Sequence, residues 1–210
     1  MSLELVAKHF PQFSENQLHQ YRSFVDTLLD VNGRINLISR KDTDEVWIRH
    51  ILHSLSIVKV ISFQPGMSVA DVGTGGGLPG IPLAIAFPET QFVLIDSIGK
   101  KIAAVREMVD KLGLKNVKAL NARMENVPDR FDFVTSRAVS ALPTMVGWLH
   151  GKVKRGNSCE LPNGLLYIKG GDFQNELDEI AKPAKMWELS GWYVDEFFET
   201  KKLIWLDIAS

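Results

Sequence analysis

The sequence predicts an α/β protein in which a mostly parallel, seven-stranded sheet is covered by helices on both faces and preceded by a helical extension. From about residue 65 onward, short apolar runs alternate with helical stretches, which is the pattern of a parallel sheet. Before that point, apolar residues recur at helical spacing. A glycine-rich segment follows the first apolar run. We therefore expect a helical extension over 1–62 and a Rossmann-like domain over 63–210, packed as one globular unit.

Two start signals divide the helical extension. Ser14 with Gln17 three residues later fits a capping box, and apolar residues then recur at helical spacing. Asp42 with Glu45 repeats this signal ahead of a second apolar series, which ends near Val58. We expect one helix to begin at each signal.

The domain after residue 62 contains strands and helices in alternation. Strands are expected at about 67–72, 91–96, 117–121, 131–136 and 164–169. Helices are expected near 79–87, 99–112, 140–150 and 173–181. Two extended runs in the tail, 186–194 and 203–208, are expected to pair as an antiparallel edge of the sheet.

The composition excludes several classes of protein. The chain has 210 residues, 45% of them hydrophobic and 23% charged, as in a globular domain. No apolar run approaches the roughly 18 residues of a membrane helix and the first residues lack a signal-peptide pattern, so we expect a cytoplasmic protein. Cys159 is the only cysteine, and the histidines show no ligand spacing with acidic residues. We therefore expect no disulfide framework and no metal site.

Residues 69–80 predict a nucleotide-cofactor loop. A strand ends at 72, and the glycines of 73–77 let the backbone turn sharply and approach a ligand. GGGLPG also fits the dinucleotide motif G-x-G-x-x-G. Asp71 favours S-adenosylmethionine, because a carboxylate before the glycines can bind the methionine ammonium and would repel a pyrophosphate. The chain also has no second domain for a hydride acceptor. We expect Asp71, Gly73 and Gly75 to hold this cofactor.

Two further segments are expected to bind the adenosine part of the cofactor. Asp96 ends the second strand, where its carboxylate can accept both ribose hydroxyls. Met124 and Glu125 follow the third strand, where Met124 would cover the adenine and Glu125 would fix it. The alternatives are structural: Asp71 would cap its own loop, Asp96 would cap the next helix, and 123–125 would be a solvated turn.

The fourth strand leads into Thr135-Ser136-Arg137-Ala138, at the reactive end of the cofactor. Enzymes that methylate exocyclic amines commonly carry Asn or Asp followed by Pro-Pro-aromatic here, and this chain does not. A pyrimidine-carbon methylase needs a nucleophilic thiol, and Cys159 lacks the usual preceding proline. Guanine N7 has a free lone pair, so its methylation needs positioning more than a general base. Arg137 would hold the cofactor carboxylate, a phosphate or the guanine edge; the alternative is a surface ion pair.

Positive charge in this sequence is local. The formal net charge is -1, so the overall charge does not indicate a nucleic-acid partner. Basic residues cluster in the extension and in loops expected around the cofactor: Arg34, Arg40, Lys41, Lys100, Lys101, Lys152, Lys154 and Arg155. Such runs are usually solvated faces, but their position favours RNA. Lys169 adds a phosphate contact, and the pair Arg49–His50 is either functional or packs on the domain.

The chain resembles one family along nearly its whole length. The resemblance is carried by Asn32 with 36–38, by 49–52 with 54–55, by DVGTGGGLPGIPLAI at 71–85, by 95–97 with Lys100 and Lys101, by 136–139 and by 169–170. These segments are similar to the RsmG family, also called glucose-inhibited division protein B, of bacterial small-subunit ribosomal RNA methyltransferases.

This resemblance implies a class I methyltransferase fold and methyl transfer from S-adenosylmethionine to N7 of one guanine in the 530 loop of 16S rRNA. The positions it implies for cofactor contact are Gly73, Leu78, Met124, Glu125 and Arg137, with Asp96 as the ribose partner. The implied partner is 16S rRNA, free or within the small ribosomal subunit, and we expect a monomer.

Three features depart from the family pattern. His53 stands where an Asp is common, the loop 151–163 is unusual, and Lys201–Lys202 occupies a place where an Arg is frequent. They affect the expected RNA contacts rather than the cofactor site.

Two other functions remain open at this point. A methyltransferase for a small molecule or a protein would suit the near-neutral charge. A cofactor-sensing RNA-binding module would suit the lack of an obvious base. The favoured hypothesis is an rRNA (guanine-N7)-methyltransferase with Arg137 at the reacting end.

Overall fold

The computed structural model describes residues 3–209. Its strands are β1 (Ser68–Val72), β2 (Gln91–Asp96), β3 (Val117–Asn121), β4 (Phe133–Arg137), β5 (Gly164–Gly170), β6 (Ala184–Glu188) and β7 (Lys201–Leu206). Its α-helices are α1 (Leu3–His9), α2 (Glu15–Asn32), α3 (His53–Leu55), α4 (Gly80–Ala86), α5 (Gly99–Leu112), α6 (Leu142–Trp148) and α7 (Gln174–Ile180). A π-helix covers Trp47–Leu52, and short 3-10 helices cover Arg40–Asp42, Ser56–Lys59, Met124–Asn126, Leu189–Gly191 and Glu196–Phe198.

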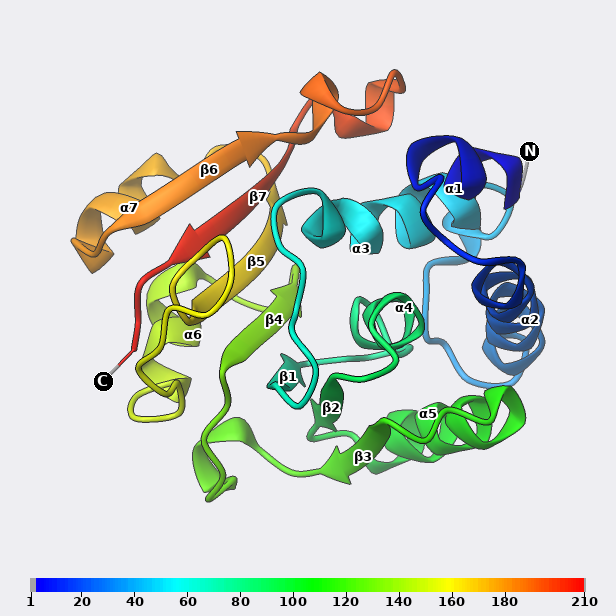
Figure 1. The fold of residues 1–210 in the computed structure, drawn as a ribbon, viewed down its shortest axis with the longest axis horizontal. Coiled ribbons are helices and arrows are strands. Elements are labelled where there is room, and N and C mark those ends of the chain that lie inside the picture. The colour runs from blue at the N-terminus through cyan, green and yellow to red at the C-terminus, as the bar shows by residue number, and fades with distance from the viewer. Residues whose placement is uncertain (1–2, 210) are drawn as a thin grey trace.

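The strands form one sheet in the order β3-β2-β1-β4-β5-β7-β6 (Figure 1). β1 to β5 run parallel, whereas β7 pairs antiparallel with β5 and with β6. The direction of winding reverses between β1 and β4, which is where open α/β sheets bind ligands. The predicted parallel sheet with an antiparallel edge is confirmed.

Apolar side chains alternate between the two faces of the sheet, because successive side chains of a strand point in opposite directions. Along β5, Leu166 and Ile168 belong to one apolar cluster, and Leu165 and Tyr167 belong to the other. The extension, α4 and α5 cover the first face, while α6 and α7 cover the second (Figure 1). Both faces are therefore buried, which explains why the strands are nearly continuous apolar runs.

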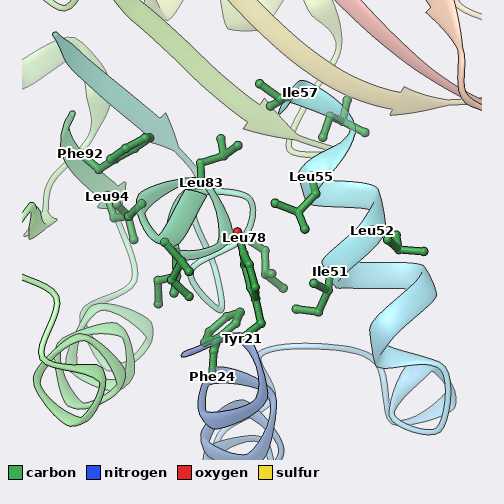
Figure 2. Packing of buried hydrophobic residues seen from close by; sticks show 14 of the residues in the cluster. Tyr21, Phe24, Ile51, Leu52, Leu55, Ile57, Leu78, Leu83, Phe92 and Leu94 are labelled. Carbon is green, nitrogen blue, oxygen red and sulfur yellow. The ribbon is translucent and has the colours of Figure 1, made fainter. Parts of the chain in front are cut away.

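The helical extension packs on α4 and α5 and shares their apolar cluster. The predicted capping box of Ser14 and Gln17 is present at the start of α2. Tyr21 is fully buried and donates a hydrogen bond to the carbonyl of Pro82, 3.0 Å away. Figure 2 shows Tyr21 and Phe24 of α2 directed toward Leu78 and the α4 region. The extension is therefore anchored on the helix that follows the glycine-rich loop.

The second helix of the extension does not begin at the predicted capping box. The carboxylates of Asp42 and Glu45 both bind the guanidinium of Arg49, and the Asp42 contact measures 3.0 Å. Ser39 caps a 3-10 turn in their place, and the helix proper is the π-helical segment Trp47–Leu52, which continues into α3. The capping-box prediction at Asp42 failed because the guanidinium of Arg49, seven residues later, binds the carboxylate of Asp42.

The predicted run 186–194 is extended only in its first part. β6 ends at Glu188, and the turn Leu189–Gly191 follows. Leu189 and Tyr193 are buried in the core, whereas Val194 is fully exposed. The apolar character of this run thus reflects a buried turn. The other predicted strands and helices of the domain end within about two residues of the observed bounds. No helix within residues 3–209 has the length and apolar character needed to cross a membrane.

Candidate functional site

A cavity of about 480 Å³ opens at the carboxyl ends of β1, β2, β3 and β4. Its volume lies within the range of about 300–1,000 Å³ that is usual for small-molecule and cofactor sites. The cavity wall includes these predicted site residues: Gly73, Gly75, Leu78, Asp96, Met124, Glu125 and Arg137. The fold therefore brings all the predicted site residues except Asp71 to one cavity.

The glycine-rich loop is tied to the end of β2. The N–H groups of Gly73 and Thr74 donate to the carbonyl of Ile95, at 2.8 and 3.0 Å. Gly73 and Gly75 have φ angles of 69° and 57°, and a Cβ atom on Gly73 would lie 2.5 Å from the side chain of Val139. Both positions therefore favour glycine strongly. The loop presents bare backbone to the cavity.

Asp71 lies beneath this loop and does not line the cavity. Its side chain is fully buried, and Oδ2 accepts hydrogen bonds from the Thr74 hydroxyl at 2.6 Å and the Gly80 N–H at 2.9 Å. Oδ1 lies 3.4 Å from the hydroxyl of Thr135. Burial raises the pKa of Asp71 to about 6, and the hydrogen bonds oppose that rise. The predicted contact with the cofactor ammonium is corrected: Asp71 caps its own loop, because the chain from Thr74 to Gly80 folds over it.

Asp96 ends β2 and reaches the cavity wall with 8% of its surface exposed. Its Oδ2 accepts the N–H of Gly75 at 3.0 Å, and its Oδ1 accepts the N–H of Ile98 at 2.9 Å. An ionised carboxylate has about four acceptor sites, so two remain for ribose hydroxyls. The capping alternative and the predicted binding role are therefore compatible in one side chain.

Met124 and Glu125 lie in the 3-10 helix that follows β3. Met124 is buried and Glu125 is exposed, and both line the cavity beside Leu78. The side chain of Lys152 fixes this segment by donating to the carbonyl of Glu125 at 3.2 Å. This side of the cavity thus combines the apolar surface of Leu78 and Met124 with the exposed carboxylate of Glu125.

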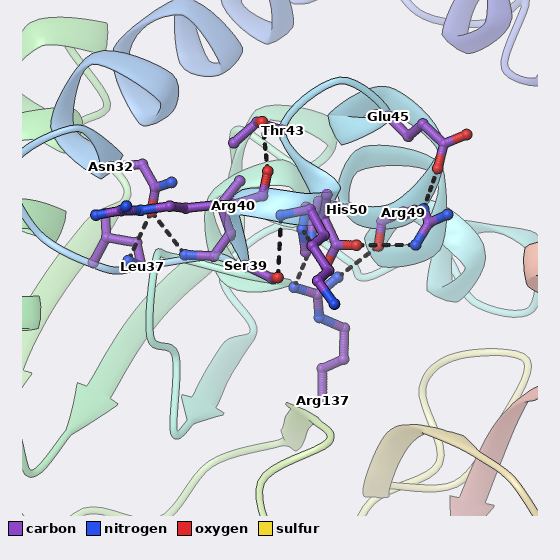
Figure 3. Close-up of polar contacts among 12 residues, drawn as sticks. Asn32, Leu37, Ser39, Arg40, Thr43, Glu45, Arg49, His50 and Arg137 are labelled. Atoms are coloured by element: carbon purple, nitrogen blue, oxygen red, sulfur yellow. Dashed lines mark hydrogen bonds and ion pairs between the residues drawn. The ribbon is translucent and has the colours of Figure 1, made fainter.

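Arg137 ends β4 and reaches the helical extension (Figure 3). Its Nη1 donates to the carbonyl of Arg49 at 3.2 Å, and its Nη2 donates to Nδ1 of His50 at 3.0 Å. Within residues 3–209 it forms no ion pair with a carboxylate. Burial lowers the pKa of Arg137 to about 10, and the charges of Asp71 and Asp42 oppose that decrease. The surface ion pair is not observed, and a protonated, half-buried guanidinium lines the cavity.

Two contacts from the extension that shape the cavity were not predicted from the sequence. Oδ1 of Asn32 accepts the N–H groups of Leu37 at 2.8 Å and Ile38 at 2.9 Å, which places Leu37 on the cavity wall. His50 binds Arg137, 87 residues away in the chain. The only sequence signal for this contact is a histidine on an apolar helix face, which usually indicates packing.

The predicted basic cluster is only partly free to bind phosphate. Arg34 pairs with Glu107 at 2.7 Å, Lys154 pairs with Asp132 at 3.2 Å, and Lys169 is bound to Glu176. The expected phosphate contact of Lys169 is therefore corrected, because a carboxylate already neutralises it. Among the described residues, Lys101 and Arg123 line the cavity and form no ion pair, and Arg40, Lys41 and Lys100, which also form no ion pair, lie in segments next to cavity-lining residues in the chain.

His53 and Cys159, which belongs to the unusual loop 151–163, are not part of the cavity wall. His53 is buried, with its ring edge-on to Phe197 at 5.1 Å, and burial lowers its pKa well below the ordinary value. It is therefore a neutral core residue and offers no exposed RNA contact. Cys159 donates to the carbonyl of Ser62 at 3.4 Å. Residues 3–209 hold no group of three acidic, histidine or cysteine side chains suited to a metal ion.

Solved structures with low sequence identity share this fold. A SAM dependent methyltransferase from Aquifex aeolicus aligns with a TM-score of 0.55 at 18% identity, over 77% of this chain and 92% of that chain. A putative S-adenosyl-L-methionine-dependent methyltransferase from Methanococcus maripaludis aligns with a TM-score of 0.56 at 15% identity, over 79% of this chain and 90% of that chain. The predicted class I methyltransferase fold is confirmed.

Relatives found by sequence have higher identity than these structures and align with nearly the whole chain. The family model described as rRNA small subunit methyltransferase G matches residues 17–203. A Christiangramia forsetii protein named Ribosomal RNA small subunit methyltransferase G is 50% identical over 98% of this chain and 97% of its own length. A Bacteroides thetaiotaomicron protein of the same name is 44% identical over 98% of this chain and 100% of its own length. With a matching family model and full-length relatives at this identity, the chain belongs to the rRNA small subunit methyltransferase G family.

Proposed function

We propose that this chain transfers the methyl group of S-adenosylmethionine to N7 of a guanine in 16S rRNA. The family membership supports methylation of small-subunit rRNA. The cavity supports the cofactor, and the chemistry of its reactive end supports the N7 atom. The resemblance of the sequence to its family further favours a guanine in the 530 loop.

The donor set of the cavity fits S-adenosylmethionine. Asp96 has free acceptor sites for the ribose hydroxyls, and Met124 and Glu125 provide apolar and acceptor surface for the adenine. Arg137 provides an unpaired cation for the carboxylate of the methionine part. Gly73 and Gly75 leave the backbone accessible between these two ends. When bound there, the cofactor supplies an electrophilic methyl group on sulfur.

The observation that carries the N7 assignment is the lack of a proton acceptor at the β4 side of the cavity. Among the described cavity-lining residues, the carboxylates are Asp96 and Glu125, both on the side of β2 and β3. The β4 side has Arg137, Ala138 and Val139. The nearby hydroxyl of Ser136 is buried and donates to the carbonyl of Val72 at 2.8 Å, so it is not a free base.

Guanine N7 suits a site of this kind because its lone pair bonds to the methyl carbon without prior loss of a proton. An exocyclic amine or a hydroxyl acceptor would have to lose one. The chain's contribution is to hold the acceptor in line with the methyl group and to exclude water. Leu37 and Trp148 on the cavity wall offer apolar surface for a base, and the cations Lys101 and Arg123 on the wall offer phosphate contacts. Arg40, Lys41 and Lys100 lie in neighbouring segments of the chain and form no ion pair among the described residues.

The test is methylation of 16S rRNA from a strain that lacks this gene, both as free RNA and in 30S particles, with labelled S-adenosylmethionine. Reduction with borohydride followed by aniline cleaves RNA at N7-methylguanine and maps the site. We expect one new cleavage site, in the 530 loop, and none with an Asp96→Ala variant. Label at a base atom that resists this cleavage would contradict the N7 assignment. Label transferred only to protein or to small molecules would contradict the RNA acceptor.

A further inference from the structure

His50 holds Arg137 through a hydrogen bond whose direction is fixed by chemistry. Nη2 of Arg137 lies 3.0 Å from Nδ1 of His50, and a guanidinium has donors only. Nδ1 must therefore carry the lone pair, and the ring hydrogen must be on Nε2. His50 is 8% exposed, and burial together with the charges of Arg137 and Arg49 lowers its pKa to about 3. The imidazole is thus a neutral acceptor at every pH at which the enzyme would work.

Both of the groups that orient Arg137 are uncharged. The second is the carbonyl of Arg49, which accepts from Nη1 at 3.2 Å. The carboxylate of Asp42 also acts on the charge of Arg137, but it binds the guanidinium of Arg49 at 3.0 Å and lies 3.7 Å from Nε2 of His50, the ring nitrogen that does not contact Arg137. Two further titratable groups lie near Arg137. His53 is neutral, and the buried carboxylate of Asp71 accepts hydrogen bonds from Thr74 and Gly80 and forms no ion pair with Arg137 among the described residues. The arrangement fixes the guanidinium without neutralising it.

The sheet order determines which end of the cofactor this free charge meets. Asp96 ends β2, and Met124 and Glu125 follow β3, so the adenosine part lies toward that end of the order β3-β2-β1-β4. Arg137 ends β4, on the other side of β1 and its loop. The methionine part of the cofactor therefore extends toward Arg137. A carboxylate is the anionic group of that part, and a guanidinium pairs with it in a bidentate manner.

We propose that His50 is a positioning residue that orients Arg137 by a neutral hydrogen bond and so leaves its charge free for the carboxylate of the cofactor. This inference rests on the proposed cofactor, not on the proposed RNA acceptor. It predicts that position 50 requires an acceptor without charge. An aspartate there would keep a hydrogen bond to Arg137 but would neutralise the guanidinium.

The test compares His50→Asn, His50→Asp and His50→Ala by calorimetry with two ligands. S-adenosylhomocysteine contains the amino-acid part, and 5′-methylthioadenosine lacks it. The asparagine amide oxygen can replace Nδ1, so we expect affinity for S-adenosylhomocysteine within about threefold of wild type. His50→Asp and His50→Ala are expected to lower that affinity about tenfold or more, because a charge-assisted pair is lost. Affinity for 5′-methylthioadenosine is expected to stay unchanged in all three.

The second ligand also reports on folding, because a misfolded variant would bind neither compound. His19→Asp on the exposed surface of α2 serves as the control for the added negative charge. Equal losses in His50→Asn and His50→Asp would overturn the proposal, since a purely structural role does not distinguish these similar shapes. Parallel loss of 5′-methylthioadenosine binding would overturn it too. The calorimetry contains no RNA, so its outcome is independent of whether the rRNA methylation assay succeeds.

Discussion

The carboxylate of Asp96 accepts the backbone N–H of Gly75 at 3.0 Å and thereby joins the end of β2 to the loop after β1. The same carboxylate reaches the cavity wall. One side chain therefore shapes the loop and faces the ligand. Removal of this carboxylate is expected to weaken cofactor binding both by releasing the loop and by removing a ligand contact.

Asp96→Ala is expected to lower the affinity for S-adenosylmethionine about 100-fold or more. The variant loses charge-assisted hydrogen bonds to the ribose, each worth about 1.5–3 kcal/mol, and leaves the N–H of Gly75 without its acceptor. Titration calorimetry measures the change. Asp110→Ala, an exposed carboxylate on α5, is the matched control and is expected to bind normally. Normal binding by Asp96→Ala would exclude the assigned ribose contact.

Asp71→Asn is expected to keep the affinity for S-adenosylmethionine within about threefold, because its amide oxygen can still accept from Thr74 and Gly80. Asp71→Ala leaves the buried N–H of Gly80 unpaired, and we expect the free energy of unfolding to fall by about 2–4 kcal/mol. Denaturant titration and calorimetry measure the two effects. A large loss of affinity in a fully stable Asp71→Asn variant would restore the direct ammonium contact that the structure disfavours.

The contrast between Asp71 and Asp96 shows what the sequence can predict about this site. Both acids were placed at strand ends by their apolar runs, and both positions were right. Their roles differ because the chain from Thr74 to Gly80 folds over Asp71 and leaves Asp96 at the wall. The periodicity of an apolar run predicts at which end of a strand a residue lies. The path of the seven-residue loop from Thr74 to Gly80 depends on tertiary packing, which that periodicity does not contain.

The helical extension shows the same limit of prediction from sequence, because one of its two capping signals was right and the other was wrong. The signal at Ser14 and Gln17 predicted the start of α2 correctly, because the Oε1 atom of Gln17 stays free to accept the N–H of Ser14 while its Nε2 donates to the carbonyls of Ile85 and Ala86. The equal signal at Asp42 and Glu45 failed because Arg49 binds both carboxylates. Its neighbour His50 then contacts Arg137 across 87 positions of sequence, and no local pattern contains that pairing.

The buried histidine His53 is expected to make the protein less stable in mild acid. Its pKa is far below 6.5 when folded and close to about 6.5 when unfolded, so the unfolded chain binds the proton more strongly below that pH. Stability is therefore fully present above pH 6.5 and is lost as the pH falls. His53→Phe removes this group, and we expect the loss of unfolding free energy between pH 7 and pH 5 to shrink by about 2 kcal/mol.

Urea titrations at the two pH values measure this difference. The raised pKa of Asp71 acts with the opposite sign between about 4 and 6, and it is common to both proteins, so it cancels in the comparison. His19→Gln, an exposed histidine, is the control and is expected to keep the wild-type slope. If His53→Phe and wild type lose the same stability, His53 is not held neutral by burial.

Ala181→Gly is expected to stabilise the protein. Ala181 ends α7 with a φ angle of 50°, a left-handed conformation that costs a residue with a Cβ atom about 1–2 kcal/mol. Glycine removes this cost but adds about 0.4–1 kcal/mol of unfolded-state entropy, so we expect a net gain of about 0.5–1 kcal/mol. Ala103→Gly, on the exposed face of the right-handed helix α5, is the matched control and should lose about 1 kcal/mol. Denaturant midpoints measure both changes in stability. A gain for Ala181→Gly together with a loss for Ala103→Gly would assign the effect to the backbone conformation at Ala181. A loss of stability in both variants would contradict strain at Ala181.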